Sequence, residues 1–116
     1  MLLSILAAAA FSCSSPKIHD GDTLRCGRER IRIANIDAPE LPGSPSCSRT
    51  KRSTHWCDYA LGKASRDALI RFVGKAPITI TPLGTDRYSR TLARVSVRGR
   101  DVGEFLIAQG LARAWR

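Results

Sequence analysis

Carboxylates are the first residues of interest, because this strongly basic chain has few of them and four lie near one another in sequence: Asp20, Asp22, Asp37 and Glu40. Carboxylates that converge repel and raise one another's pKa unless a cation lies among them. A hard divalent ion such as Ca²⁺ or Mg²⁺ prefers oxygen ligands of this kind. The alternative is that Asp20 and Asp37 only mark turns, since each precedes a turn-forming residue.

Two arginines could complete such a site. Arg32 lies on the polar side of a predicted strand that ends in Asp37, and Arg90 begins a later predicted strand. A guanidinium presents a planar fork that matches two phosphate oxygens. Together with a metal, two such groups would offset the negative charge that grows when water attacks a phosphoryl centre. The alternative is that both are solvated surface arginines.

Apolar runs and turn signals predict the elements that must position these groups. We expect strands at 11–18, 23–26, 30–36, 78–81 and 91–97, with a turn starting at 82–84. A helix capped by Thr54 or Asp58 should end at Gly74, and a second, short helix at 105–107 should stop at Gly110. Gly62 costs about 1 kcal/mol inside the first helix. This order suits a small, bent antiparallel barrel.

Alternation within the predicted strands indicates which side chains form the core. The candidates are Ile31, Ile33, Ile36, Leu92, Val95 and Val97.

Length and charge narrow the class of protein. The chain has 116 residues, which suits one domain, and its net charge of +9 with a pI near 10.3 attracts polyanions such as nucleic acid. No apolar run approaches the roughly 20 residues that span a bilayer. Residues 1–10 resemble the apolar part of an export signal, although no Lys or Arg precedes the run. The alternative for this run is a short buried helix or strand.

Four cysteines without a C-x-x-C spacing favour two disulfides over a zinc site. Cys13 and Cys26 flank the predicted hairpin turn symmetrically, so their sulfurs would face each other across the ladder. Cys47 and Cys57 bracket a basic loop, and closing it would contribute about 3 kcal/mol. This pairing suits an oxidising compartment, and we expect a secreted or periplasmic protein. Free thiols in a cytosolic protein are the alternative.

Ordered motifs give the chain a family resemblance. Asp20–Leu24, Arg30–Glu40, Asp86–Ala93, Asp101–Gly103 and Gly110–Ala114 occur in the same order as in the staphylococcal nuclease family, which the chain resembles over residues 11–116. The resemblance implies a mainly β fold (β/α+β), a five-stranded OB-fold barrel with two to three packed helices. It also implies Ca²⁺-dependent hydrolysis of phosphodiester bonds in DNA and RNA, single-stranded or frayed strands being preferred, by a monomer.

The resemblance also implies roles for particular residues. Asp22 and Asp37 match the aspartates that bind calcium, and Ala38 stands where the family can lend a backbone carbonyl to the metal. Glu40 matches the glutamate that orients or deprotonates the attacking water. The roles of the remaining positions concern the phosphate: Arg32 and Arg90 match the arginines that hold and polarise it, Tyr88 matches a tyrosine near it, and Arg87 is expected to contact substrate.

Two departures from the family pattern bear on these expectations. Ser89 replaces a glycine common in its turn, a mild change if its backbone is not left-handed. Aromatic residues that would stack on a base are missing from their usual stretch, and Tyr59 or Trp115 are candidates to replace them. The alternative to a nuclease is a non-catalytic nucleic-acid-binding OB domain of the same family, which cleavage of DNA in Ca²⁺ would distinguish.

Overall fold

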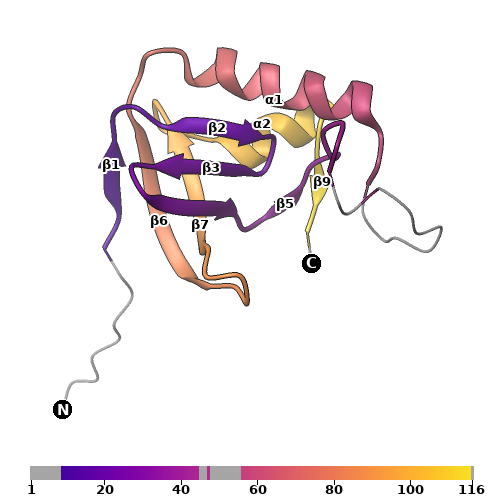
Figure 1. Cartoon of the computed structure of the whole chain (residues 1–116). Coiled ribbons are helices and arrows are strands. Elements are labelled where there is room, and N and C mark those ends of the chain that lie inside the picture. Colours follow the sequence, from indigo (N-terminus) through magenta and orange to yellow (C-terminus); the bar gives the residue numbers. More distant parts are fainter. Residues whose placement is uncertain (1–8, 45–46, 48–55, 116) are drawn as a thin grey trace.

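A curled, half-closed sheet forms the body of the protein and two helices pack on it (Figure 1). The computed structural model describes residues 9–44, 47 and 56–115. The sheet contains, in spatial order, β1 (Phe11–Cys13), β6 (Ile78–Thr85), β7 (Thr91–Val97), β4 (Glu29–Ile33), β3 (Thr23–Cys26) and β2 (Lys17–Asp20), with β8 (Arg100–Asp101) beside β7. The paired strands are antiparallel except for β4 and β7.

Shorter elements complete the fold. They are β5 (Ile36–Asp37) and β9 (Arg113–Ala114), which pair antiparallel, and the helices α1 (Tyr59–Val73) and α2 (Val102–Ala108). The five longest strands in the described part of the chain are β2, β3, β4, β6 and β7. The arrangement is OB-fold-like and of the β/α+β class, as the sequence predicts.

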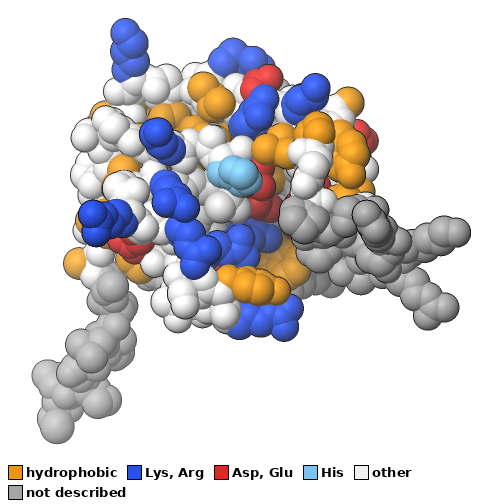
Figure 2. All heavy atoms as spheres, in the orientation of Figure 1, with side chains coloured by type: hydrophobic (Ala, Val, Ile, Leu, Met, Phe, Trp, Pro, Cys, Tyr) orange, Lys and Arg blue, Asp and Glu red, His pale blue; other side chains and the backbone are white. Residues whose placement is uncertain are grey.

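The core lies between the concave side of the sheet and the helices. Ile31, Ile33 and Ile36 are fully buried, as expected, and Val95 and Val97 are buried with them. Leu92 was predicted to be a core residue, and this is wrong: the period of two in β7 turns Ala93 inward and leaves Leu92 half-buried on the other face. Lys and Arg side chains gather on the outer face of β2, β3 and β4 (Figure 2).

The predicted first strand at 11–18 is two strands. Pro16 has no N–H to donate, so the ladder is interrupted between β1, which pairs with β6, and β2, which pairs with β3. The structure contains both disulfides, Cys13–Cys26 and Cys47–Cys57. Cys13 and Cys26 are not partners across a hairpin ladder. Their disulfide joins β1 at one edge of the sheet to β3 near the other edge, and so ties the curled sheet together.

The boundaries of two further elements, α1 and β6, refine or differ from the predictions. The side chain of Asp58 accepts a hydrogen bond from the N–H of Leu61 at the start of α1, and Gly74 ends the helix with φ 57°. β6 runs four residues beyond its predicted end, with a register shift between Pro82 and Gly84. The pairing of β6 with β1 stops at Ile80, so Pro82 interrupts no hydrogen bond on that side.

The remaining expectations concern the chain before β1 and the membrane. Most of the predicted export signal at 1–10, namely residues 1–8, lies outside the described residues, as does Thr54, one of the two predicted helix caps. Neither α1 nor α2 has the length and hydrophobicity that crossing a bilayer requires.

Candidate active site

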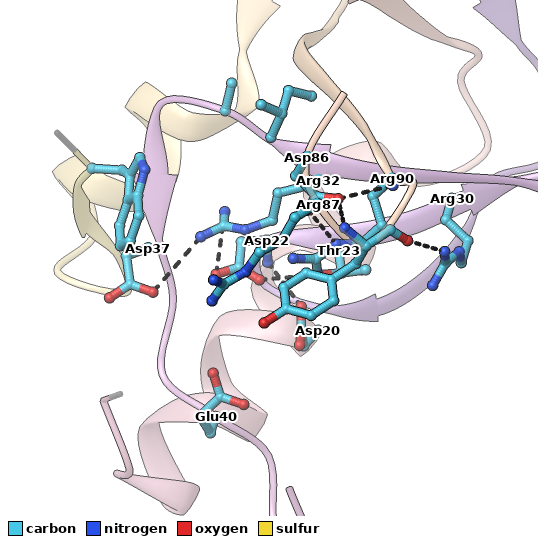
Figure 3. Close-up of a pocket in the computed structure, with 14 residues that line it drawn as sticks. Asp20, Asp22, Thr23, Arg30, Arg32, Asp37, Glu40, Asp86, Arg87 and Arg90 are labelled. Atoms are coloured by element: carbon cyan, nitrogen blue, oxygen red, sulfur yellow. Dashed lines mark hydrogen bonds and ion pairs between the residues drawn. The ribbon is translucent and has the colours of Figure 1, made fainter. Parts of the chain in front are cut away.

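A pocket of about 680 Å³ opens at one end of the sheet, where segments far apart in sequence meet (Figure 3). The parallel pairing of β4 with β7 sets Arg32 beside Leu92 and so brings Arg90 close to the same pocket. The pocket-lining residues that the sequence predicts are Asp22, Arg32, Asp37, Glu40, Arg87, Tyr88 and Arg90. Ala38 is buried and does not line it.

Arg32 lies between the two aspartates predicted to bind metal. Its Nη1 is 3.5 Å from Oδ2 of Asp22, and its Nη2 is 3.9 Å from Oδ1 of Asp37. Nη1 also donates hydrogen bonds to the carbonyl oxygens of Ile33 and Ile36, at 2.7 and 2.8 Å. With a side chain only 13% exposed, Arg32 is held firmly at the wall of the pocket and bridges the acidic groups.

Asp22 ties β3 to the segment that follows β5. Its Oδ2 accepts a hydrogen bond from the backbone N–H of Ala38 at 2.8 Å, and its Oδ1 accepts one from the hydroxyl of Thr23 at 3.2 Å. The residue is buried, with 7% of its surface exposed. The contact of Ala38 with the site therefore runs through its amide.

Asp20 adds a further acid to this end of the pocket. Its Oδ1 accepts a hydrogen bond from the backbone N–H of Asp22 at 3.1 Å. Burial, and then the nearby negative charge of Asp22, raise the pKa of Asp20 to about 7. The surroundings of Asp20 therefore disfavour its charged form.

These contacts bear on whether a divalent cation fits the site. Asp22 and Asp37 offer carboxylate oxygens, the donors that Ca²⁺ prefers, and the raised pKa of Asp20 is typical of acids lacking a counter-ion. Within the described ranges, however, no three Asp, Glu, His or Cys side chains are grouped closely enough to hold a metal. Glu40 also lines the pocket but lies apart from Asp37 (Figure 3). The donor types suit Ca²⁺, and Arg32 is a cation that competes for the same carboxylates.

Glu40 owes its position to close packing against α1. The N–H of Glu40 donates to the carbonyl of Trp56 at 2.7 Å, and Oε1 accepts a hydrogen bond from the hydroxyl of Ser44 at 2.6 Å. A Cβ on Gly62 would lie 2.2 Å from the carbonyl oxygen of Glu40. The glycine inside the helix, unfavourable by propensity, is therefore what lets α1 approach the segment that carries Glu40.

A second close approach holds the β2–β3 turn. A Cβ on Gly21 would lie 2.1 Å from Oγ of Ser65 in α1 and 2.8 Å from Cβ of Ala38. Only a residue without a side chain allows this turn, which precedes Asp22, to pack against the helix.

The β6–β7 turn is organised by Asp86, which the sequence analysis placed in a motif but gave no role. Oδ1 of Asp86 accepts hydrogen bonds from the N–H groups of Tyr88 and Arg90, both at 2.9 Å, and Oδ2 lies 2.8 Å from Nε of Arg90. Although burial opposes it, these hydrogen bonds and the charge of Arg90 hold the pKa of Asp86 below its usual value. Asp86 thereby positions the guanidinium of Arg90.

The same turn places Arg87 and Tyr88, the residues that the sequence predicts to contact substrate. Arg30 donates a hydrogen bond to the carbonyl of Tyr88, and the guanidinium groups of Arg87 and Arg90 lie 5.1 and 5.5 Å from the centre of its ring. Ser89 has φ 63°, so its backbone is left-handed and the replacement of glycine there is strained rather than mild.

The last described residues add two contacts to the site, one from Arg113, for which the sequence predicts no role, and one from Trp115, a predicted stacking residue. β9 pairs with β5 so that Arg113 is opposite Asp37, and Nη2 of Arg113 is 2.8 Å from Oδ2 of Asp37. Trp115, 56% exposed, lines the pocket, and the guanidinium of Arg32 is 5.5 Å from the centre of its ring. Tyr59, the other aromatic candidate, is not among the pocket residues.

Comparison with known proteins gives a consistent result. A sequence model of the family described as "Staphylococcal nuclease homologue" matches residues 30–116. The chain is 31% identical over 120 residues to an uncharacterized endonuclease of Haemophilus influenzae, covering 99% of this chain and 58% of that protein. It is 33% identical over 101 residues to an uncharacterized endonuclease of Escherichia coli O157:H7, covering 83% and 56%. Protein ParB of Escherichia coli is 30% identical over 139 residues, covering 100% and 70%. The chain thus spans little more than half the length of both endonuclease relatives.

Proposed function

The chain belongs to the staphylococcal nuclease family, and on that premise we propose that it is a nuclease that hydrolyses phosphodiester bonds in DNA and RNA. The observation that carries the proposal is one pocket whose lining includes the guanidinium groups of Arg32 and Arg90 and the carboxylate of Glu40. Arginine forks bind phosphate oxygens, and a carboxylate can take a proton from water, so the pocket holds the parts that phosphodiester hydrolysis needs.

Arg32 and Arg90 hold the scissile phosphate and offset the charge that develops on its oxygens. Each is held before substrate arrives, Arg32 by backbone carbonyls and Arg90 by Asp86. Groups that are already oriented need little reorganisation in the transition state, which makes their stabilisation effective.

Glu40 orients the attacking water and accepts its proton. The water oxygen forms a bond to phosphorus while the bond from phosphorus to the leaving oxygen breaks. Ser44 and the backbone of Trp56 fix the carboxylate and the main chain of Glu40, so the base has a defined position.

We propose Ca²⁺ as the cofactor, held by Asp22, Asp37 and the backbone carbonyl of Ala38. When bound, it would supply a Lewis acid and a counter-charge for the phosphoryl oxygens. Because both carboxylates are already paired with Arg32, and Asp37 also with Arg113, cation binding competes with these ion pairs.

We further propose that Tyr88 and Arg87 contact the nucleotide next to the scissile bond and that Trp115 stacks on a base. Tyr88, Arg87 and Trp115 line the pocket, and stacking needs bases that are not paired. We therefore expect single-stranded or frayed DNA and RNA to be the preferred substrates. We also propose that the protein acts as a monomer. The two disulfides support a secreted or periplasmic location.

The test is cleavage of single-stranded DNA by the wild type, Glu40→Gln and Glu104→Gln, with Ca²⁺ and with EGTA. Glu104, exposed on α2, is the matched control for the same change of side chain. We expect EGTA to stop cleavage and Ca²⁺ to restore it, and Glu40→Gln to lower the rate by about 10²–10³ while Glu104→Gln does not. Binding without cleavage in Ca²⁺ would instead support the non-catalytic nucleic-acid-binding domain.

A further inference from the structure

Three cationic side chains form a row across the outer face of the sheet. Lys17 of β2 is the register partner of Arg25 of β3, and Arg25 is the register partner of Arg30 of β4. All three are exposed, while their neighbours Ile18, Leu24 and Ile31 point to the core side. The Lys and Arg side chains gathered over these strands are visible in Figure 2.

This row, Lys17–Arg25–Arg30, is unfavourable for the fold by itself. Like charges directly opposite each other on adjacent strands destabilise a sheet. In the part of the chain that the structure describes, no carboxylate forms an ion pair with any of the three. Other arginines of the protein, such as Arg90 and Arg94, do have acidic partners. An external anion would relieve the repulsion that the row contains.

The row is continuous with the pocket. Arg30 both lines the pocket and donates a hydrogen bond to the carbonyl of Tyr88 in the turn that carries Arg87 and Arg90. Adjacent strands lie about 4.8 Å apart, so three register partners span about 10 Å. A strand of a duplex advances about 3.4 Å along the helix axis per phosphate, and an extended single strand advances further, so the row is long enough for about two successive phosphates.

Resting on the proposed function, we propose that Lys17, Arg25 and Arg30 bind the phosphate backbone of a single nucleic-acid strand outside the pocket and lead it to the scissile position. The contact is with phosphates, so it is independent of base sequence. Its effect is greater affinity for long strands than for substrates that fill only the pocket.

The test compares two double variants with equal loss of charge. Lys17→Gln/Arg25→Gln removes two members of the row, and Lys63→Gln/Arg71→Gln removes one exposed Lys and one exposed Arg from α1. Binding of a fluorescent 20-nucleotide single-stranded DNA is followed by anisotropy in EGTA between 50 and 200 mM salt. The logarithm of the binding constant falls as the logarithm of the salt concentration rises. Losing two phosphate contacts should make this slope less steep by about 1.4, while the α1 variant keeps the wild-type slope.

Three further measurements identify the cause. Arg25→Lys keeps the charge and should keep the slope. Cleavage of a dinucleotide, which reaches only the pocket, should be the same in the row variant and the wild type. The thermal midpoint of the row variant should be no lower than that of the wild type, because a like-charge pair is removed. An unchanged slope in the row variant, or an equal fall in the two double variants, would overturn the proposal.

This binding experiment is separate from the test of catalysis. It uses EGTA and measures no cleavage, so the row can be supported even if Glu40→Gln and the wild type prove equally inactive. Conversely, if the wild type cleaves DNA but Lys17→Gln/Arg25→Gln has the wild-type salt slope, the proposed function stands and the proposal that the row binds phosphates is refuted.

Discussion

Arg32, which we propose binds the phosphate, also pairs with two buried acids in this structure. Asp22 and Asp37 have little exposed surface, and Arg32 is paired with both. A substitution at Arg32 therefore reports on stability as well as on turnover. A substitution at Glu40 differs in this respect, because the partners of Glu40 are a hydroxyl and a backbone carbonyl rather than buried acids.

We expect Arg32→Ala to lower the free energy of unfolding by about 3 kcal/mol, because it removes the arginine paired with buried Asp22 and one of the two arginines paired with Asp37. Chemical denaturation measures this loss. Arg66→Ala is the matched control, since the pair of Arg66 with Asp67 is largely exposed and should be worth less than about 1 kcal/mol. Equal effects of the two substitutions would contradict the role of Arg32 as an internal counter-ion.

We expect Ser89→Gly to raise the free energy of unfolding by about 1 kcal/mol, because glycine adopts the left-handed conformation at φ 63° without strain. Ser96→Gly, in the regular strand β7, should instead lower stability by about 0.5–1 kcal/mol. Thermal unfolding of the two variants against the wild type checks both signs. A loss of stability in Ser89→Gly would show that its hydroxyl contributes more than the backbone strain costs.

Among the elements, α1 supports the site from behind through two small residues. Gly62 and Ser65 are buried where the helix meets the segment of Glu40 and the turn before Asp22. Small residues there allow close approach of backbone to backbone, and the helix then fixes two acidic segments at once.

We expect Gly62→Ala to lower the free energy of unfolding by about 2–3 kcal/mol, because the new methyl group would meet the carbonyl of Glu40. In an ordinary helix the same change would stabilise by about 1 kcal/mol. Lys63→Ala, the exposed neighbour in α1, should stay within about 0.5 kcal/mol of the wild type. Calorimetry of both variants decides, and a more stable Gly62→Ala protein would refute the close approach.

The β6–β7 turn is the element that should respond to acid. Because the pKa of Asp86 is held below its ordinary value of 3.8, its carboxylate stabilises the folded state above that pH and loses this effect as the pH falls through the lower folded value. Asp86→Asn should therefore be less stable than the wild type at pH 6, and the difference should shrink below about pH 4. Asp67→Asn, on the exposed surface of α1, is the control for removal of a carboxylate. A pH-independent difference between Asp86→Asn and the wild type would exclude this linkage.

For the whole molecule, the disulfides connect parts that the sheet alone leaves apart. Cys13–Cys26 joins β1 to β3 across the curled sheet, and Cys47–Cys57 closes the segment between the Glu40 region and α1. At about 3 kcal/mol each, such links are a large share of the net stability of about 5–15 kcal/mol that is typical of a domain.

Removal of either disulfide, as Cys13→Ser/Cys26→Ser or Cys47→Ser/Cys57→Ser, should lower the free energy of unfolding by about 3 kcal/mol, since the two loops are of similar length. Denaturation with and without reducing agent measures the effect in the wild type and in each variant. If reducing agent does not change the stability of the wild type, the disulfides no longer support an oxidising compartment.

Local sequence signals predicted much of the fold. The burial of Ile31 and Ile33 followed from alternation, and the end of α1 followed from Gly74. Two errors have different causes. The division of the first strand at Pro16 follows from the different partners of its two parts, which only the tertiary structure shows. The orientation of Leu92 follows from the period of two in β7, where it alternates with the inward-facing Ala93 and Val95.

By itself, the sequence determined the family, the class of fold and the residue types that meet in the pocket, because motif order, periodicity and charge are properties of the chain read along its length. Only the tertiary structure decided that Arg32 lies between Asp22 and Asp37, that Arg113 pairs with Asp37, and that Lys17, Arg25 and Arg30 align. These contacts depend on strand register and on the packing of segments as many as 76 residues apart, and no local pattern in the chain specifies them.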